Sequence, residues 1–115
     1  MTDEQIMATS LREQISSATQ DSLGLCIFGR SVTNVQVEFI TNAINDALGT
    51  SLTPEFYLQL GREALKLEWE FNKQAGFTTQ DDELPKFFYE EPLPPTNHVA
   101  RFHGEDVQQV VARLE

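Results

Sequence analysis

The chain has 115 residues, of which 40% are hydrophobic, and this is enough for one ordinary domain with a packed core. Its 18 acidic residues outnumber its 8 basic ones, and the resulting net charge of −10 argues against nucleic acids and anionic membrane surfaces as partners. The sequence contains no apolar run of about 18 residues that would span a membrane, and its polar start lacks a signal-peptide pattern. Together with a single cysteine, these features predict a reducing, cytoplasmic setting.

Apolar residues at helical spacing predict a first helix over residues 3–19. The short apolar run Leu23–Phe28 follows, and its periodicity leaves open whether it is a buried helical segment or a strand. A second helix is expected from about Thr33 to Leu48, with Gly49 just beyond its end. Thr53-Pro54-Glu55 combines an N-capping residue, a first-turn proline and an acid, which predicts a third helix that stops at Gly76.

The stretch from residue 78 to residue 97, TTQDDELPKFFYEEPLPPTN, contains four prolines and clustered acids. It predicts an ordered but irregular wrap with one short turn at Pro85–Tyr89, and GEDVQQVVARLE then predicts a last short helix. No alternating strand pattern of useful length appears. The expected fold is therefore all-α, an irregular bundle of four to five helices with a Pro-rich extended C-terminal wrap, forming one domain over residues 1–115.

The stretch DSLGLC, Asp21 to Cys26, contains the only cysteine of the chain. It resembles the D-x-x-G-L-C motif of the aldehyde ferredoxin oxidoreductases, which are tungsten- or molybdenum-pterin enzymes. Further segments resemble this family in the same order over roughly residues 10–95. These are Thr53-Pro54-Glu55, Gly61-Arg62, Leu67-Glu68, Phe71-Asn72, Gly76-Phe77, Asp81-Asp82, Leu84-Pro85 and Glu91-Pro92-Leu93-Pro94.

The resemblance implies that the chain corresponds to the helical C-terminal domain of the family. By the same resemblance, Asp21 matches the residue that hydrogen-bonds the pterin, and Cys26 matches a thiolate ligand of a 4Fe–4S cluster. A carboxylate suits the N–H donors of a pterin, and thiolates are the usual cluster ligands. Gly24 and Leu25 complete the candidate cofactor-binding segment, where Gly24 would let the backbone approach a bulky cofactor.

Two departures from the family pattern limit what this chain can do alone. The family's C-x-x-C-x-x-x-C motif, which carries the other three cluster cysteines, is absent, and so is its N-terminal β domain. At single positions, Leu65 stands where an aromatic residue is usual and Glu63 where a basic one is common. We therefore expect no cofactor and no catalysis in the isolated chain, and either missing domains or a sister subunit as its partner.

Two functions from different classes remain at this stage. In the first, the chain is the C-terminal domain or subunit of an enzyme that oxidises aldehydes with ferredoxin as the acceptor, supplying one cluster ligand and one pterin contact. In the second, it is a non-catalytic helical interaction module derived from that domain. We consider three origins for the chain: a domain cut from a larger enzyme, a subunit of a split enzyme, or a stand-alone relic. We also expect the isolated chain to self-associate through apolar surface that its missing partners leave uncovered.

Each candidate residue also has a structural explanation. Cys26 could be a buried core thiol, although Gly24 and Gly29 favour an accessible one, and Asp21 could be an N-cap or a surface acid. We expect His98 and His103 to be exposed, and Trp69, Phe71 and Phe77 to lie in the core. A solvated surface is expected for five acids: Asp81, Asp82, Glu83, Glu90 and Glu91.

Overall fold

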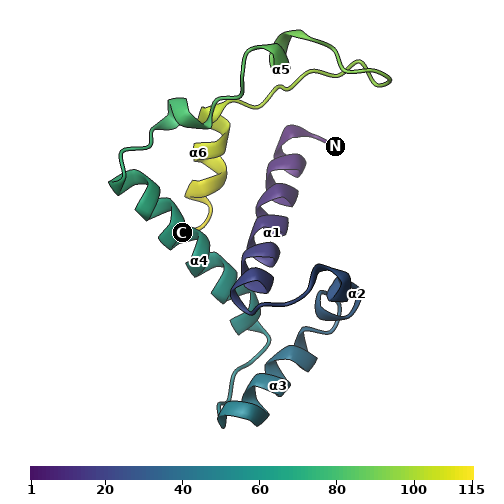
Figure 1. Ribbon diagram of the computed structural model, residues 1–115, viewed down its shortest axis with the longest axis vertical. Coiled ribbons are helices and arrows are strands. Elements are labelled where there is room, and N and C mark those ends of the chain that lie inside the picture. Colours follow the sequence, from purple (N-terminus) through teal and green to yellow (C-terminus); the bar gives the residue numbers. More distant parts are fainter. The chain divides into compact units, whose positions relative to one another are not determined.

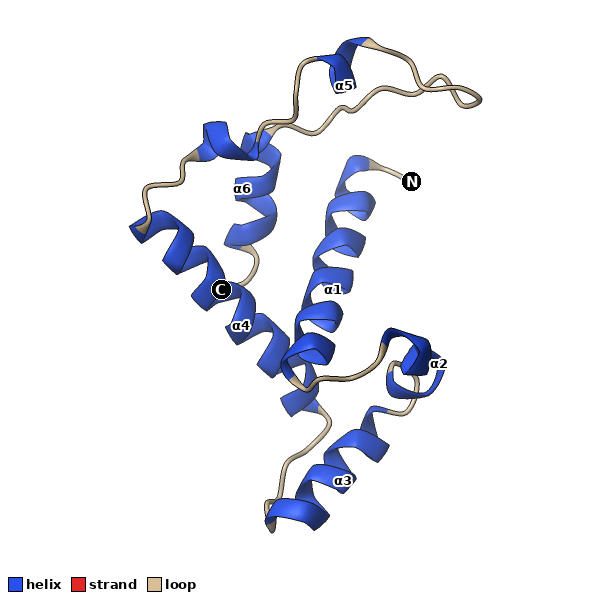
Figure 2. Cartoon of the chain, in the orientation of Figure 1, coloured by secondary structure: helices blue, strands red, loops and turns tan.

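The computed structural model describes all 115 residues, and it is built from helices without a β-sheet (Figure 2). Along the chain the elements are α1 (Asp3–Ser22), η1 (Ile27–Gly29), α2 (Arg30–Thr33), α3 (Val37–Leu48), α4 (Glu55–Gln74), η2 (Thr79–Asp82), α5 (Phe87–Glu90) and α6 (Gly104–Ala112) (Figure 1). The only β contact is an isolated antiparallel bridge between Leu93 and His98. The all-α prediction is confirmed, and none of the helices is both long and apolar enough to cross a membrane.

The helices begin and end close to the predicted positions, because their termini carry strong local signals. Thr2 caps α1 through a capping box with Gln5, and left-handed glycines follow α3 at Gly49 and α4 at Gly76. The expected second helix begins later than predicted, at Val37 rather than near Thr33, and the separate short helix α2 covers residues 30–33 before it. The predicted turn near Pro85 is present as α5.

The internal contacts gather in two units, Met1–Glu68 and Trp69–Glu115. The prediction of a single domain stays a prediction. The first unit contains α1, η1, α2, α3 and most of α4, and the second contains the end of α4 with η2, α5 and α6.

In the first unit, α1 packs against the first half of α4 at Gly61. A Cβ atom built on Gly61 would lie 2.0 Å from the Ile15 carbonyl oxygen and 2.4 Å from Thr19 Oγ1, so only glycine allows this approach. The buried Thr19 hydroxyl donates across the crossing to the Tyr57 carbonyl at 2.6 Å. This contact fixes the C-terminal half of α1, which leads into the candidate cofactor-binding segment.

The hydrophobic core is thin. Its buried apolar side chains are Leu11, Ile15, Ile40 and Tyr57 in the first unit and Val110 and Leu114 in the second. The prediction that Phe71 and Phe77 lie in the core is wrong, because these side chains are 70% and 59% exposed. Trp69, also expected in the core, is half-buried.

Candidate functional site

The candidate cofactor-binding segment is the C-terminal end of α1 and the turn that follows it. Gly24 adopts a left-handed conformation, with φ of +66°. The Gly24 amide donates to the Asp21 carbonyl at 3.1 Å, and the Leu25 amide donates to the Gln20 carbonyl at 2.8 Å. These two bonds form a glycine-terminated helix end, in which a residue with a side chain would be strained. The spacing of D-x-x-G-L-C therefore has a local cause: the glycine ends the helix three residues after the aspartate.

Asp21 lies in the last turn of α1 and is exposed. It is therefore not an N-cap, and of the two structural explanations only the surface acid remains. Its carboxylate forms no hydrogen bond or ion pair within the chain, and the last turn contains no basic residue. A negative charge is disfavoured at the C-terminal end of a helix, so the helix itself gives no reason for an acid at this position. Asp21 is thus open to a partner that offers N–H donors.

Cys26 follows the turn as an exposed, free thiol. The prediction of an accessible Cys26 is confirmed, and the alternative of a buried core thiol is wrong. The Cys26 carbonyl accepts from the Gly29 amide at 2.9 Å, which starts the η1 turn. A Cβ atom on Gly24 would meet no other atom within 4 Å. The backbone between Asp21 and Cys26 therefore has free space on that side, as an approaching cofactor requires.

The expectation that Leu23–Phe28 is a buried helical segment or a strand is wrong. Leu23 and Leu25 are half-buried, whereas Ile27 and Phe28 are 60% and 93% exposed in the η1 turn. The chain leaves α1 at the helix end at Gly24, and the apolar residues that follow become increasingly exposed to solvent.

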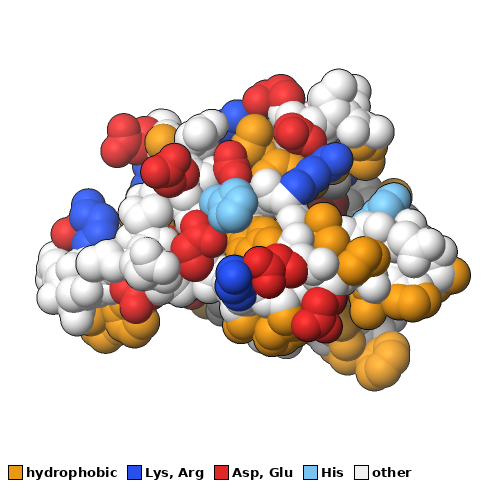
Figure 3. Space-filling view, turned by 90° about the horizontal axis from the view of Figure 1, so that it is seen from above, with side chains coloured by type: hydrophobic (Ala, Val, Ile, Leu, Met, Phe, Trp, Pro, Cys, Tyr) orange, Lys and Arg blue, Asp and Glu red, His pale blue; other side chains and the backbone are white.

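Further apolar side chains lie open close to this segment in the sequence. Val32, Val35 and Phe39 are exposed on α2, on the linker after it and on α3. We call these three residues, together with Ile27 and Phe28, the flanking apolar surface. Exposed hydrophobic side chains between carboxylates are also visible on the face drawn in Figure 3. Exposed apolar side chains that gather into a large patch mark an interface more often than a solvated face.

Two buried polar residues position the segment, and the sequence reasoning missed both. The Gln20 side chain is 1% exposed; its Nε2 donates to Ser16 Oγ at 3.1 Å and to Asn34 Oδ1. This contact ties the last turn of α1 to the residue that follows α2. Thr19, which is fully buried, joins the same turn to α4. No sequence pattern identifies either residue as buried, because a glutamine or threonine in a polar stretch is normally predicted to be exposed.

In the structure, no group of three or more cysteine, histidine or acidic side chains is arranged to hold a metal ion. Cys26 offers one soft sulfur donor, and the Asp21 carboxylate offers hydrogen-bond acceptors only. His98 and His103 are exposed, as predicted.

Comparison with known proteins identified one family and several relatives. The family model described as "Aldehyde ferredoxin oxidoreductase, domains 2 & 3" matches residues 2–113. A tungsten-containing aldehyde ferredoxin oxidoreductase of Pyrococcus furiosus is 36% identical over 95 residues, which cover 82% of this chain and 15% of that protein. The enzyme of the same name from Thermococcus kodakarensis is 34% identical over 105 residues, covering 88% of this chain and 17% of that protein. No solved structure matched.

Proposed function

Because the chain belongs to the aldehyde ferredoxin oxidoreductase family, we propose that it completes the redox centre of such an enzyme. The match is to domains 2 and 3, and the chain spans only 15% to 17% of the length of the curated relatives it matches. Most of the enzyme must then lie in other domains or in a sister subunit. Those parts would carry the three-cysteine motif and the β domain that this sequence lacks.

Two side chains carry the proposed role. The Cys26 thiolate is the fourth ligand of a 4Fe–4S cluster, and the Asp21 carboxylate accepts hydrogen bonds from a tungsten- or molybdenum-pterin. Gly24 and Leu25 form the turn between them. The observation that supports this assignment most is that both side chains are exposed and unpartnered at one glycine-terminated helix end.

In the assembled enzyme, Asp21 would contact the pterin and Cys26 would hold the cluster; these groups would supply the two-electron oxidation of an aldehyde and water to a carboxylic acid, with ferredoxin as the electron acceptor. This chain's contribution is positional. The helix end holds Asp21 and Cys26 five residues apart, so a short stretch of backbone contacts both centres. The free thiol is consistent with a reducing, cytoplasmic setting.

The flanking apolar surface supports a partner of this kind. Phe28 is almost fully exposed two residues after Cys26, where a neighbouring domain that holds the cluster would cover it. The same exposed surface also fits the second candidate, a non-catalytic interaction module. The two differ in whether Cys26 becomes a metal ligand in the assembly.

The test is anaerobic assembly of this chain with the polypeptide that carries the three-cysteine motif, followed by iron analysis and visible absorption. We expect the chain alone to remain colourless and the assembly to acquire cluster absorption. Cys26→Ala should lower the iron content of the assembly, while Ser31→Ala, a change at an exposed residue of α2, should not. An assembly with full iron in the Cys26→Ala variant would favour the interaction module.

A further inference from the structure

Residues 84–102 of the second unit form an excursion that leaves η2 and returns to α6, here called the arm. No residue of the arm is buried, and large apolar side chains such as Phe87 and Leu93 are exposed. Hydrophobic burial therefore does little to hold the arm in place. Its attachment must come from polar contacts at its base, where the chain leaves and returns.

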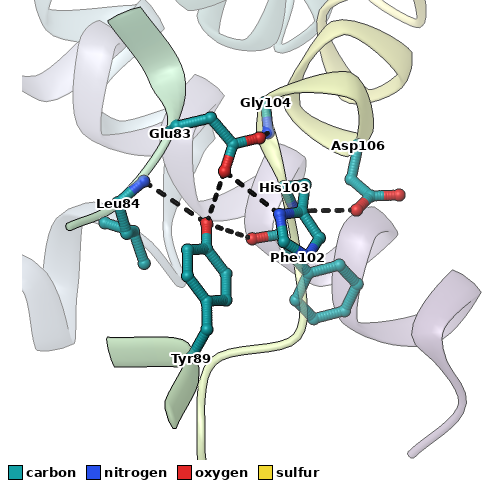
Figure 4. A network of polar contacts seen from close by, with 7 residues as sticks. All are labelled: Glu83, Leu84, Tyr89, Phe102, His103, Gly104 and Asp106. Atoms are coloured by element: carbon teal, nitrogen blue, oxygen red, sulfur yellow. Dashed lines mark hydrogen bonds and ion pairs between the residues drawn. The ribbon is translucent and has the colours of Figure 1, made fainter. Parts of the chain in front are cut away.

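The polar contacts at the base of the arm gather around the Glu83 carboxylate and the Tyr89 hydroxyl (Figure 4). Glu83 Oε1 accepts from the Gly104 amide at 2.7 Å, and Oε2 lies 3.0 Å from the Tyr89 hydroxyl and 3.1 Å from His103 Nδ1. The Tyr89 and His103 rings stack with their centroids 4.4 Å apart. One side chain thus joins the outgoing end of the arm, its α5 helix and the first residues of α6.

The α6 side of this contact is rigid. Gly104 is buried at the start of α6, and a Cβ atom there would lie 2.3 Å from the Thr79 carbonyl of η2. Its amide is one of the free N–H groups of a helix N-terminus, where a negative charge is favoured. The His103 amide is already held by Asp106 Oδ2 at 2.8 Å. The position of the donor is therefore fixed, and the charge of Glu83 decides whether the contact is strong.

The arm is also held together internally. The Tyr89 hydroxyl lies 3.3 Å from the Leu84 amide nitrogen and 3.1 Å from the Phe102 carbonyl oxygen, and two further bonds join backbone to backbone. The Ala100 amide donates to the Phe88 carbonyl at 2.7 Å, and the Leu93 amide donates to the His98 carbonyl at 3.1 Å. These backbone bonds connect the two limbs of the arm in its middle and at its tip. They do not depend on pH, whereas the contact at the base does.

We propose that Glu83 is a charge-dependent latch, whose neutralisation releases the arm from α6 as one body. In the closed state, the Gly104 amide and then the His103 ring hold the pKa of Glu83 below its ordinary value, with the Tyr89 hydroxyl adding to the effect. Burial raises the pKa of Tyr89, and the Glu83 carboxylate adds to that. The other titratable groups around the carboxylate are Tyr89, His103, the preceding Asp82 on η2 and Asp106 on α6, which accepts from the His103 amide; Glu83 is the acid that bonds both Tyr89 and the start of α6.

The direction of the pH effect follows from the lowered pKa. The Glu83 latch is fully formed above the ordinary glutamate pKa of about 4.3. It is lost as the pH falls through the lower pKa that Glu83 has in the folded chain. The arm should then open in acid while its own backbone bonds persist. A lowered carboxylate pKa cannot produce opening on the alkaline side.

The experiment is nuclear magnetic resonance of the ¹⁵N-labelled full chain between neutral and acidic pH. In the wild type, the Gly104 amide signal should follow the titration of Glu83, and amides across the arm should gain fast motion together while those of α6 do not. Glu83→Gln should show the mobile arm already at neutral pH, with about a tenfold loss of hydrogen-exchange protection at the Gly104 amide. Glu91→Gln, an exposed acid on the same arm, is the matched control and should behave as the wild type.

Two results would overturn the latch. The first is an arm that remains ordered in Glu83→Gln at every pH. The second is loss of the arm and α6 at the same pH, since this would mean global unfolding. Tyr89→Phe keeps the Glu83 carboxylate and removes the hydroxyl that contacts it, so this variant tests the attachment of the arm independently. It should weaken the arm's attachment while leaving the pH dependence at Gly104 in place.

Discussion

Replacing Gly61 with alanine tests the packing that holds the end of α1 in place. In an open helix, this substitution would stabilise the chain by about 1 kcal/mol, because alanine is the better helix former. Here the added Cβ atom would lie 2.0 Å from the Ile15 carbonyl oxygen and 2.4 Å from Thr19 Oγ1. The nearer atom belongs to the backbone, so one of the two helices must shift.

Overpacking of a close contact costs about 1–3 kcal/mol, and a backbone clash belongs at the upper end of that range. With the gain in helix propensity subtracted, Gly61→Ala should lower the free energy of unfolding by about 2 kcal/mol. Urea denaturation followed by far-UV circular dichroism measures it. Gly29→Ala is the control, since a Cβ atom at Gly29 meets nothing within 4 Å and its φ is −87°. A Gly61→Ala chain at least as stable as the wild type would refute this account of the α1–α4 contact.

Three further predictions concern the same unit. Thr19→Val should lower the free energy of unfolding by about 1 kcal/mol, because it removes the buried hydrogen bond to the Tyr57 carbonyl. Thr41→Val is the control and should cost less in the same urea titration, because the Thr41 hydroxyl bonds only within its own helix. A thiol reagent should label native Cys26 at a rate close to that of the urea-unfolded chain; labelling slower by orders of magnitude would show that the thiol is not exposed as described. The isolated chain should self-associate through the flanking apolar surface, and Phe28→Ser should weaken this in sedimentation at several concentrations; a wild-type chain that stays monomeric throughout would contradict it.

The sequence was sufficient to predict the helices whose ends carry local signals. Proline and threonine before α4, and glycines after α3 and α4, place those termini because each residue type satisfies a specific backbone requirement. The DSLGLC stretch was identified by resemblance, and the structure adds the physical reason for its glycine, which is the left-handed residue that ends α1.

The exposure of apolar residues could not be predicted in the same way. Periodicity finds the apolar face of a helix, but it does not reveal what covers that face. Phe71 has helical spacing and is nevertheless 70% exposed, and Phe77, just beyond the end of α4, is 59% exposed. The prediction of a core at these positions rested on the apolar character of the residues alone.

Long-range polar contacts were equally hidden. Glu83 stands in an acidic stretch and was expected to be solvated, but it is half-buried and accepts hydrogen bonds from residues up to 21 positions away. Asp82 is also half-buried and accepts from Gln108. Such pairs depend on how the chain returns along the arm, which no local pattern specifies.

The central claim is that Cys26 becomes a cluster ligand when the chain joins the rest of a family enzyme. The most direct measurement is electron paramagnetic resonance of the reduced assembly, with Cys26→Ser compared against the wild type and the Ser31→Ala control. The account predicts a 4Fe–4S signal of full intensity in the wild type and the control, and an altered or lost signal in Cys26→Ser. An unchanged signal in an assembly that contains Cys26→Ser would contradict it.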